Sequence, residues 1–251
     1  MIRASIVGVM THPLLTAVVT GAASGMGAAV AERFVTEGWR VLALDADPDR
    51  IARIKDRLGE GLVPARVDIR SRADVEAALA GFGDVGQLRA LVNAAGIYPT
   101  STLADFTEDA YRRIFDVNVL GTLNVTAAGV PLIRAHGGGG AVVNFASIDA
   151  FAVSRGQLIY SASKAAVVSI TRSLAIELAD DRICVNAVAP GWVATEGTLA
   201  GGRIQEAAKA VPLGRAAEPE EIADWVWKLA SVPGSYLTGE TLVISGGLVL
   251  R

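Results

Sequence analysis

Short apolar runs alternate with longer amphipathic segments along most of the chain, and this alternation most constrains the fold. Runs rich in Val, Ile, Leu and Ala are typical of strands that are buried on both faces of a sheet. The predicted strands are 17–20, 40–44, 62–67, 90–93, 141–146, 183–188 and 241–244. The predicted helices are 25–37, 47–58, 71–80, about 108–136, about 157–179 and 218–231. Strands that alternate with helices predict an α/β fold, a doubly wound parallel sheet of about seven strands with helices on both faces.

The chain is expected to fold as a single domain. It has 251 residues, of which 51% are hydrophobic, and this is enough for the core of one α/β domain. The glycine run at 137–140 is too short to separate two domains and fits a turn before the fifth strand. We expect residues 1–14 to form an N-terminal extension and residues 15–251 to form the domain. Charged residues make up only 20% of the chain, which favours a homo-oligomer that buries apolar surface.

Composition argues against several classes of function. The net charge is -3 and no basic block is present, so we expect no nucleic-acid binding. With one cysteine, Cys184, and two histidines, His12 and His136, we expect neither a disulfide framework nor a metal site. Residues 4–31 carry no Asp, Glu, Lys or Arg, but Pro13 and several glycines interrupt this stretch, so no membrane span is expected. The sequence therefore predicts a soluble, cytoplasmic protein that has no membrane partner.

A glycine-rich turn follows the first predicted strand and opens the first predicted helix. Residues 20–27 read T-G-A-A-S-G-M-G. Glycines let the backbone turn sharply and let a pyrophosphate approach the N-terminus of the helix. The spacing G-x-x-x-G-x-G differs from the common G-x-G-x-x-G, so the turn by itself leaves a glycine turn without a ligand as an alternative.

Asp45 ends the second predicted strand, 18 residues after Gly27. A carboxylate at this position accepts hydrogen bonds from the adenosine ribose hydroxyls and repels a 2′-phosphate. Neither Ala46 nor the glycine turn supplies a Lys or Arg. The pattern therefore favours NAD over NADP as the cofactor. Asp45 could instead cap the next helix, but Asp47, directly before Pro48, suits that role better.

Tyr160 and Lys164 lie four residues apart in a predicted helix, so their side chains share one face. A free phenol has a pKa of about 10 and is a poor base at neutral pH. A neighbouring ammonium favours the phenolate, so we expect Lys164 to lower the pKa of Tyr160 for acid/base chemistry. The Y-x-x-x-K pattern alone also occurs on many solvated helices. Ser147 adds context, because it ends the fifth predicted strand, where parallel-sheet active sites gather.

Taken together, these features resemble the short-chain dehydrogenase/reductase family. The resemblance extends over about residues 15–247, with the order and spacing of the motifs kept. The motifs are the glycine turn 20–27, Asp68, N-A-A-G at 93–96, Asn118, Ser147, Tyr160 with Lys164, and Pro190-Gly191 with Thr195. The resemblance implies a Rossmann-type fold, a dinucleotide-binding catalytic domain at 15–251, NAD as cofactor, and a homo-oligomer, a dimer or a homotetramer.

The resemblance also implies catalytic roles for four residues. Tyr160 would be the general acid/base, and Lys164 would lower its pKa and hold the nicotinamide ribose. Ser147 would orient and polarise the substrate carbonyl. Asn118 would hold a water in a proton relay through Lys164.

The implied cofactor contacts are spread over the whole resemblance. Asp68 and Ile69 would contact adenine, and Val193 and Thr195 would hold the carboxamide. The full expected set is Gly21, Ser24, Gly25, Met26, Gly27, Asp45, Asp68, Ile69, Asn93, Gly96, Tyr160, Lys164, Val193 and Thr195.

The substrate end of the site is less strongly specified. The segment 195–212 is rich in Gly and Ala, which fits either a lid over cofactor and substrate or a loop without fixed structure. Asp149, two residues after Ser147, is either a partner for a second hydroxyl or an amine of the substrate or a capping residue. The expected substrate residues are Ser147, Asp149, Val153 and Trp192, with Ile97, Tyr98 and Phe151 as further pocket candidates.

Together these expectations predict an NAD-dependent oxidoreductase that works in the oxidative direction. It would transfer hydride between a secondary alcohol or ketone, a small-molecule substrate, and the nicotinamide ring, with Tyr160 as general acid/base. One alternative is an NADPH-dependent ketoreductase of the 3-oxoacyl-carrier-protein reductase type, against which Asp45 argues. The other is a catalytically silent dinucleotide-binding regulator, against which the intact Ser147, Tyr160 and Lys164 argue.

Overall fold

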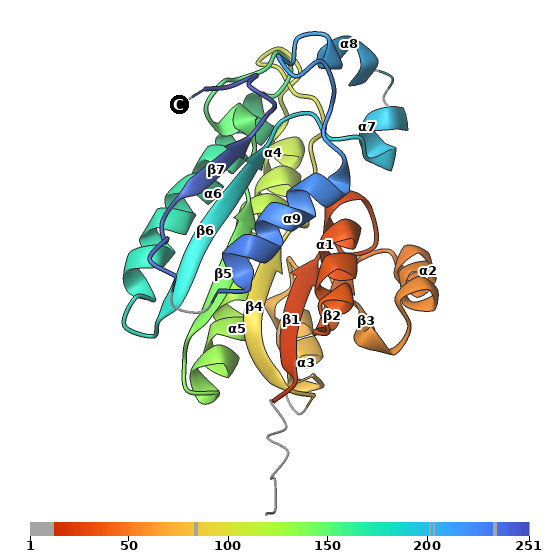
Figure 1. Ribbon diagram of the computed structural model, residues 1–251. Coiled ribbons are helices and arrows are strands. Elements are labelled where there is room, and N and C mark those ends of the chain that lie inside the picture. Colours follow the sequence, from red (N-terminus) through yellow and green to blue (C-terminus); the bar gives the residue numbers. More distant parts are fainter. Residues whose placement is uncertain (1–12, 83–84, 201, 203, 233–234, 251) are drawn as a thin grey trace, which may run out of the picture.

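The computed structural model describes residues 13–250 except 83–84, 201, 203 and 233–234, and this part contains one parallel sheet of seven strands (Figure 1). Expectations for residues 1–12, which are most of the predicted extension, lie outside the described residues. The order is β3-β2-β1-β4-β5-β6-β7, and every neighbouring pair is parallel. The strands are β1 (Leu15–Thr20), β2 (Arg40–Asp45), β3 (Leu62–Arg66), β4 (Gln87–Asn93), β5 (Gly140–Phe145), β6 (Ile183–Pro190) and β7 (Thr241–Ile244). The predicted doubly wound α/β sheet is confirmed.

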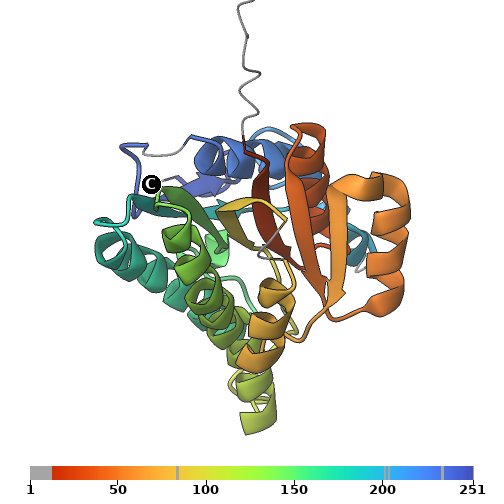
Figure 2. The same ribbon diagram turned by 90° about the horizontal axis from the view of Figure 1, so that it is seen from below.

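Helices cover both faces of this sheet (Figure 2). The helices on one face are α1 (Gly25–Thr36), α2 (Pro48–Leu58) and α9 (Pro219–Ala230). The helices on the other face are α3 (Arg72–Ala80), α5 (Thr122–Ala135) and α6 (Leu158–Glu177). The remaining α-helices of the described chain are α4 (Glu108–Phe115), which precedes α5, and the short α7 (Glu196–Ala200) and α8 (Ile204–Ala208) near the carboxyl ends of the strands.

Successive residues of the central strands point into two different cores. In β1, Ala17 and Val19 pack with α1, α2 and α9, whereas Val18 packs with α3 and α5. In β2, Leu42 and Leu44 likewise point toward the second core. Because side chains alternate between the faces of a strand and both faces are covered, most positions are apolar. This is why the strands are visible in the sequence as continuous apolar runs.

The sheet changes its direction of winding between β1 and β4. The chain first builds outward through β2 and β3, then returns to add β4 on the other side of β1. In such a sheet a crevice opens at the carboxyl ends of the strands where the winding reverses. Thr20, the last residue of β1, is in register with Leu44 on one side and Asn93 on the other. The residues that follow these three strands therefore meet at one place.

The helix expected at about 108–136 is not a single regular helix. α4 ends at Phe115, a π-helical turn, η2, runs over Asp116–Gly121, and α5 begins at Thr122. A π turn is a wider turn than an α turn and occurs often at functional sites. The side chain of Asn118 in this turn makes hydrogen bonds to Ile97 and Ser163. These tertiary bonds were not predictable from helical periodicity.

The helical stretch Glu108–Ala135 is, among the described helices, the one long and apolar enough to cross a membrane. Its most apolar window has a mean hydropathy of 1.2, and 50% of that window is buried inside the fold. α5 packs against β4 and α3. Packing against the sheet therefore accounts for its apolar character.

Candidate active site

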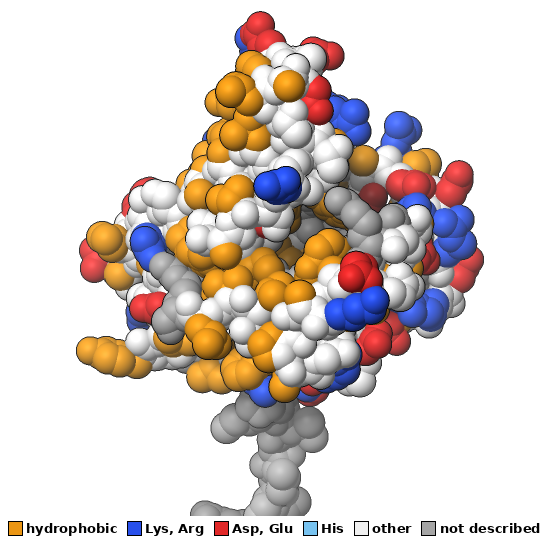
Figure 3. All heavy atoms as spheres, turned by 90° about the horizontal axis from the view of Figure 1, so that it is seen from above, with side chains coloured by type: hydrophobic (Ala, Val, Ile, Leu, Met, Phe, Trp, Pro, Cys, Tyr) orange, Lys and Arg blue, Asp and Glu red, His pale blue; other side chains and the backbone are white. Residues whose placement is uncertain are grey.

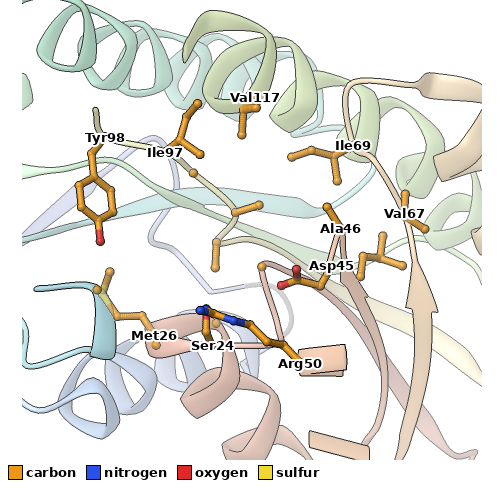
Figure 4. Close-up of a pocket in the computed structure, with 18 of the residues that line it drawn as sticks. Ser24, Met26, Asp45, Ala46, Arg50, Val67, Ile69, Ile97, Tyr98 and Val117 are labelled. Atoms are coloured by element: carbon orange, nitrogen blue, oxygen red, sulfur yellow. The ribbon is translucent and has the colours of Figure 1, made fainter. Parts of the chain in front are cut away.

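A cleft of about 520 Å³ lies at the carboxyl ends of β1, β2 and β4. Seen from this end, the molecule is hollowed near the centre, where hydrophobic side chains gather, and most charged side chains lie toward the margins (Figure 3). Figure 4 shows Ser24 and Arg50 on one side of the cleft and Ile97 and Val117 on the opposite side, with Asp45 between them. Its volume is within the range of small-molecule and cofactor sites.

The glycine turn brings the N-terminus of α1 to the floor of this cleft. Gly21 has φ +63°, and a Cβ there would lie 2.8 Å from Ala95 Cα. A Cβ on Gly27 would collide with the backbone oxygen of Gly21. Side chains are thus excluded where the turn passes β4 and enters the helix. The N–H groups and the positive end of the dipole at a helix N-terminus favour an anion. With Gly25, Ser24 and Met26 also at the cleft wall, the turn fits a pyrophosphate.

Asp45 is fixed at the edge of the cleft by two backbone groups. Its Oδ2 accepts a hydrogen bond from the N–H of Ala23 at 3.0 Å, and its Oδ1 accepts one from Asp47 at 3.0 Å. The Asp47 carboxylate caps α2 by accepting from the N–H groups of Asp49 and Arg50. Asp47 is therefore the capping residue, as the sequence predicts, and Asp45 lines the cleft; its contact with a ribose stays a prediction.

Arg50 is a cleft residue that the sequence analysis missed. It lies in the first turn of α2 and lines the cleft near Asp45 (Figure 4). Its Nε lies 3.4 Å from Asp47 Oδ2. Arg50 lies beyond both Ala46 and the glycine turn, the positions that were expected to select the cofactor. The capping signal at Asp47 would have located Arg50 in the first helical turn, at the same edge of the sheet.

Asp68 and Ile69 follow β3 and line the cleft beyond Asp45. A hydrogen bond from the Arg70 guanidinium, with Nη2 2.6 Å from Asp68 Oδ2, holds the pKa of the Asp68 carboxyl below its usual value. Asn124 of α5 donates to the carbonyl oxygens of Ile69 and Arg70 at 2.9 and 3.1 Å. This segment is therefore anchored to α5, and its contact with adenine stays a prediction.

The predicted catalytic side chains meet beyond the end of β5. Tyr160 lies in the first turn of α6, and the Lys164 Nζ is 5.7 Å from the centroid of its ring. Ser147 follows β5 and lines the same pocket as Tyr160. The ring of Tyr98 meets that of Tyr160 edge to face, with centroids 6.2 Å apart. A phenol, a hydroxyl and an ammonium are thus grouped where the cleft continues into a second pocket.

Burial governs the ionisation of this pair. Desolvation raises the pKa of Tyr160 to about 12; hydrogen bonding to Ser147 opposes the rise, and the charge of Asp149 adds to it. Desolvation lowers the pKa of Lys164 to about 8. In the chain alone the net shift of the Tyr160 pKa is therefore upward, and the expected lowering by Lys164 stays a prediction. The ammonium of Lys164 instead donates to the carbonyl oxygen of Phe145 at 2.6 Å. Tyr160 is held as a neutral phenol, the form that can donate a proton.

Asn118 fixes the segment after β4 against α6. Its Oδ1 accepts from the N–H of Ile97 at 2.9 Å, and its Nδ2 donates to Ile97 O at 2.9 Å and to Ser163 Oγ at 3.0 Å. A Cβ on Gly96 would lie 3.3 Å from Asn118 Oδ1 and 3.4 Å from Lys164 Nζ. Asn118 and Lys164 therefore converge beside Gly96, which lines the cleft. The role of Asn118 in a water relay stays a prediction.

Asn93 lies outside the lining of the cleft, although the sequence predicts it there. Its side chain is buried and donates to Thr126 Oγ1 at 3.1 Å and to Asn144 Oδ1 at 2.9 Å. Asn144 in turn donates to Thr171 Oγ1 at 3.0 Å. The backbone position of Asn93 at the end of β4 was predicted, but its side chain faces β5 and α5. It ties the sheet to the helices that carry the site.

The second pocket has a volume of about 180 Å³ and adjoins the cleft at Tyr98. Three of the four expected substrate residues, Ser147, Asp149 and Trp192, line it, and their contact with a substrate stays a prediction. Val153 does not, since it is 71% exposed and lies outside the lining. The pocket is also lined by five further residues that were expected at the site: Met26, Tyr98, Tyr160, Val193 and Thr195. Gln157 lines it as well and was not expected from the sequence.

The predicted lid segment contains two short helices, α7 and α8. Thr195, before α7, accepts a hydrogen bond from Thr198 N–H at 3.4 Å, and the Thr198 hydroxyl donates to Val193 O at 2.6 Å. Gly197 of α7 faces the opposite wall, since a Cβ there would lie 2.5 Å from the hydroxyl of Tyr98. Thr195 and Gly197 thus line both the cleft and the second pocket, and the role of the segment as a lid stays a prediction.

Comparisons with known proteins agree with this geometry. A family model described as enoyl-(acyl carrier protein) reductase matches residues 21–249. An uncharacterised oxidoreductase of Methylorubrum extorquens is 38% identical over 245 residues, covering 92% of this chain and 96% of the relative. Galactitol 2-dehydrogenase of Agrobacterium fabrum is 33% identical over 248 residues, covering 92% of this chain and 96% of the relative.

A solved structure extends the similarity to the fold. It is a 3-ketoacyl-(acyl-carrier-protein) reductase from Brucella melitensis complexed with NADH, with a TM-score of 0.87 and 32% identity, covering 94% of this chain and 98% of that one. Members of this family bind a nicotinamide cofactor and act on CH–OH or oxo groups of small molecules. The chain belongs to the short-chain dehydrogenase/reductase family of oxidoreductases.

Proposed function

We propose that the protein is an NAD-dependent dehydrogenase that interconverts a secondary alcohol and a ketone. The observation that carries this proposal is the position of Tyr160, beside Ser147 and one helical turn from the buried Lys164, where the cofactor cleft meets the second pocket. A nicotinamide cofactor in the cleft supplies the hydride acceptor for the carbinol carbon. The chain's own residues would then handle the substrate oxygen and its proton.

The acid/base chemistry follows from the state of the phenol. In ketone reduction, Tyr160 donates its proton to the oxygen of the substrate, and Ser147 holds that oxygen by a hydrogen bond. In alcohol oxidation, the same phenol must first lose its proton and then accept one from the substrate hydroxyl. Because the pKa of Tyr160 is raised to about 12, the chain alone favours the proton donor. A cationic group bound beside the phenol would favour the base form.

The preference for NAD is inferred from Asp45. The backbone bonds from Ala23 and Asp47 hold its carboxylate at the cleft edge, where it can accept from ribose hydroxyls and repel a 2′-phosphate. Replacing Asp45 by Ala removes both effects. We expect Asp45→Ala to weaken NADH binding about 10-fold or more, because a pair of charge-assisted hydrogen bonds is lost. We expect the same variant to bind NADPH more tightly than the wild type does. Titration of cofactor fluorescence measures both affinities.

The decisive test of the function is turnover of a panel of secondary alcohols with NAD⁺, followed by absorbance of the reduced cofactor. Tyr160→Phe keeps the ring but removes the exchangeable proton, so we expect it to lose activity by about 10²-fold or more while still binding NADH. Ser147→Ala should reduce activity and also leave cofactor binding intact. Undiminished turnover by Tyr160→Phe would refute the role of the phenol.

Arg50 favours a second candidate, an NADPH-dependent ketoreductase of the 3-oxoacyl-carrier-protein reductase type. Its guanidinium lies at the cleft wall near Asp45, where it could pair with a 2′-phosphate (Figure 4). The two candidates differ in the effect of Arg50→Ala. This variant should leave NADH affinity almost unchanged if NAD is the cofactor, and should weaken NADPH binding strongly if NADP is.

We also propose that a single domain, residues 15–251 with a lid at about 195–212, acts as a homo-oligomer, a dimer or tetramer, in the cytoplasm. Support for the assembly comes from exposed apolar side chains on η2, α5 and α6: Leu120, Leu123, Leu158 and Ile176 are 44%, 37%, 47% and 82% exposed. Such side chains on neighbouring helices are typical of surfaces that become buried between subunits. Light scattering during size-exclusion chromatography gives the assembly size, and a monomer would contradict this proposal.

A further inference from the structure

The cofactor cleft and the second pocket share part of their walls. Among the described residues, the ones that line both are Met26, Tyr98, Thr195 and Gly197. These residues therefore surround the junction at which the two spaces connect. Tyr98 has the largest side chain of the set. In Figure 4 it stands at one end of the cleft, with its hydroxyl pointing toward Met26 on the other wall.

The ring of Tyr98 spans the junction from α7 to the phenol of Tyr160. At its hydroxyl end it faces Gly197, where a Cβ would lie 2.5 Å from the hydroxyl oxygen and 3.8 Å from Cζ. It also meets the ring of Tyr160, with centroids 6.2 Å apart and an interplanar angle of 69°. This is a contact distance for an edge-to-face aromatic pair, so no further carbon atom fits between the two rings.

The backbone on both sides of Tyr98 is fixed. Before it, Asn118 of η2 bonds to the N–H and to the carbonyl oxygen of Ile97, both at 2.9 Å. After it, Ser101 Oγ accepts from the N–H of Ile159 in α6 at 3.2 Å. The segment that carries Tyr98 is thus tied to η2 at one end and to α6 at the other. A preorganised wall resists displacement by a ligand, and discrimination by size requires this.

The backbones that carry the two tyrosines are also linked to each other. Asn118 Nδ2 donates to Ser163 Oγ at 3.0 Å, and the Ser163 hydroxyl donates to the carbonyl oxygen of Tyr160 at 2.7 Å. Both side chains in this link are buried. The asparagine that holds the segment before Tyr98 therefore also holds the first turn of α6. The separation of the two rings is set by these buried bonds as well as by the ring contact.

Hydride transfer at Tyr160 places the reacting carbon at this junction. Its oxygen must reach the Tyr160 hydroxyl, and its hydrogen must face a cofactor in the cleft. Of the two remaining substituents, one can extend into the second pocket, and the other must lie toward the wall that Tyr98 and Gly197 form. Because α7 closes this wall at one end and the ring contact closes it at the other, little space is left for the second substituent.

We propose that Tyr98 is a specificity-determining residue that limits one substituent of the reacting carbon to a methyl group, so that the preferred substrates are methyl carbinols and methyl ketones. This inference rests on the proposed hydride transfer at Tyr160. The other substituent lies in the second pocket, whose volume of about 180 Å³ bounds its size as well. Removing the ring of Tyr98 opens the junction, and larger groups are then accepted on that side.

The test compares two alcohols of the same composition: pentan-2-ol, which has a methyl group on the carbinol, and pentan-3-ol, which has two ethyl groups. Wild-type protein with NAD⁺ should oxidise pentan-2-ol with a kcat/KM about 10-fold or more above that of pentan-3-ol, since a closed wall rejects an extra methylene by about this factor. Tyr98→Ala should bring the two values within about threefold of each other. Tyr98→Phe keeps the ring and should keep the preference. Tyr236→Ala, a fully exposed tyrosine outside both linings, is the matched control and should keep it too.

A binding measurement separates failure of this inference from failure of the proposed function. Calorimetry of the two alcohols with NAD⁺-loaded Tyr160→Phe protein needs no turnover. Pentan-2-ol should bind about 10-fold or more tightly than pentan-3-ol, and adding Tyr98→Ala should remove this difference. If neither alcohol is oxidised but the difference in binding is seen, the size limit stands and the redox proposal fails. Equal turnover of the two alcohols by the wild type overturns the inference while the proposed function stands, and so does a preference that Tyr98→Ala leaves unchanged.

Discussion

Burial of the Lys164 ammonium destabilises the folded state, and the loss of unfolding free energy can be measured. The residue is 5% exposed, and burial lowers its pKa from 10.5 to about 8. Between these values the unfolded chain binds more protons than the folded one, so unfolding free energy rises with pH. At pH 7 the shift to about 8 lowers the unfolding free energy by about 3 kcal/mol, and at pH 9.5 by about 1 kcal/mol.

The perturbation that isolates this effect is Lys164→Met, which keeps the length of the side chain and removes its charge. Subtracting the unfolding free energy of the variant from that of the wild type gives a difference. This difference should become more positive by about 2 kcal/mol between pH 7 and pH 9.5. Other titrating groups are shared by the two proteins and largely cancel. The loss of the hydrogen bond to Phe145 O adds a nearly constant offset, which the comparison across pH removes. Urea denaturation at a series of pH values measures the difference.

Lys209→Met is the matched control, because the Lys209 side chain is 72% exposed and pairs with Glu206 at the surface. Its difference from the wild type should hardly change over the same pH range. The Lys164→Met variant should also lose most turnover while it still folds. A Lys164→Met difference that does not vary with pH would refute the argument that burial lowers this pKa.

Two further substitutions test the packing around the site. Asn144→Ala removes the acceptor of Asn93 and the donor to Thr171. We expect it to lower the unfolding free energy, measured by urea denaturation, by about 2–4 kcal/mol. An effect below about 1 kcal/mol would contradict the importance of this hydrogen-bond network. Gly197→Ala places a Cβ 2.5 Å from the Tyr98 hydroxyl, so it should change kcat and KM together with little loss of stability. Adding Tyr98→Phe removes that hydroxyl and should restore turnover. Failure of this rescue would show that the two residues do not contact each other.

The fold was predictable because its strongest signals are local. Strands covered on both faces are mostly apolar, and some of the helices begin with a capping side chain, as α2 does at Asp47. The turn at 116–121 gave no such signal. Its residues continue a helical pattern, and what widens the turn is the bonding of Asn118 to Ile97 and Ser163, from segments far away in sequence.

The difference between local signals and contacts from distant segments also explains which site residues were predicted correctly. Asp45 was assigned to the cleft from its position at the end of a strand, and the structure has it there. Asn93 has the same kind of position, yet its side chain faces Asn144, its partner in register on β5. Which way a side chain at a strand end turns depends on the neighbouring strand, and no pattern within one strand contains that information.

The pKa of Tyr160 shows why spacing is an incomplete guide to chemistry. The four-residue separation places Lys164 beside the phenol as predicted, but spacing does not state how deeply the pair is buried. Desolvation acts on both groups at once, raising the pKa of Tyr160 and lowering that of Lys164, so both are driven toward neutral forms. With its pKa raised, the phenol of the chain alone is a proton donor rather than a base at neutral pH. The cleft that Asp45 and the glycine turn form leads to this pair, so we infer that binding of the oxidised, cationic nicotinamide and ionisation of the phenol are coupled. If they are, NAD⁺ will lower the apparent pKa of alcohol oxidation in wild type, and a pH profile that is unchanged between subsaturating and saturating NAD⁺ would show that they are independent.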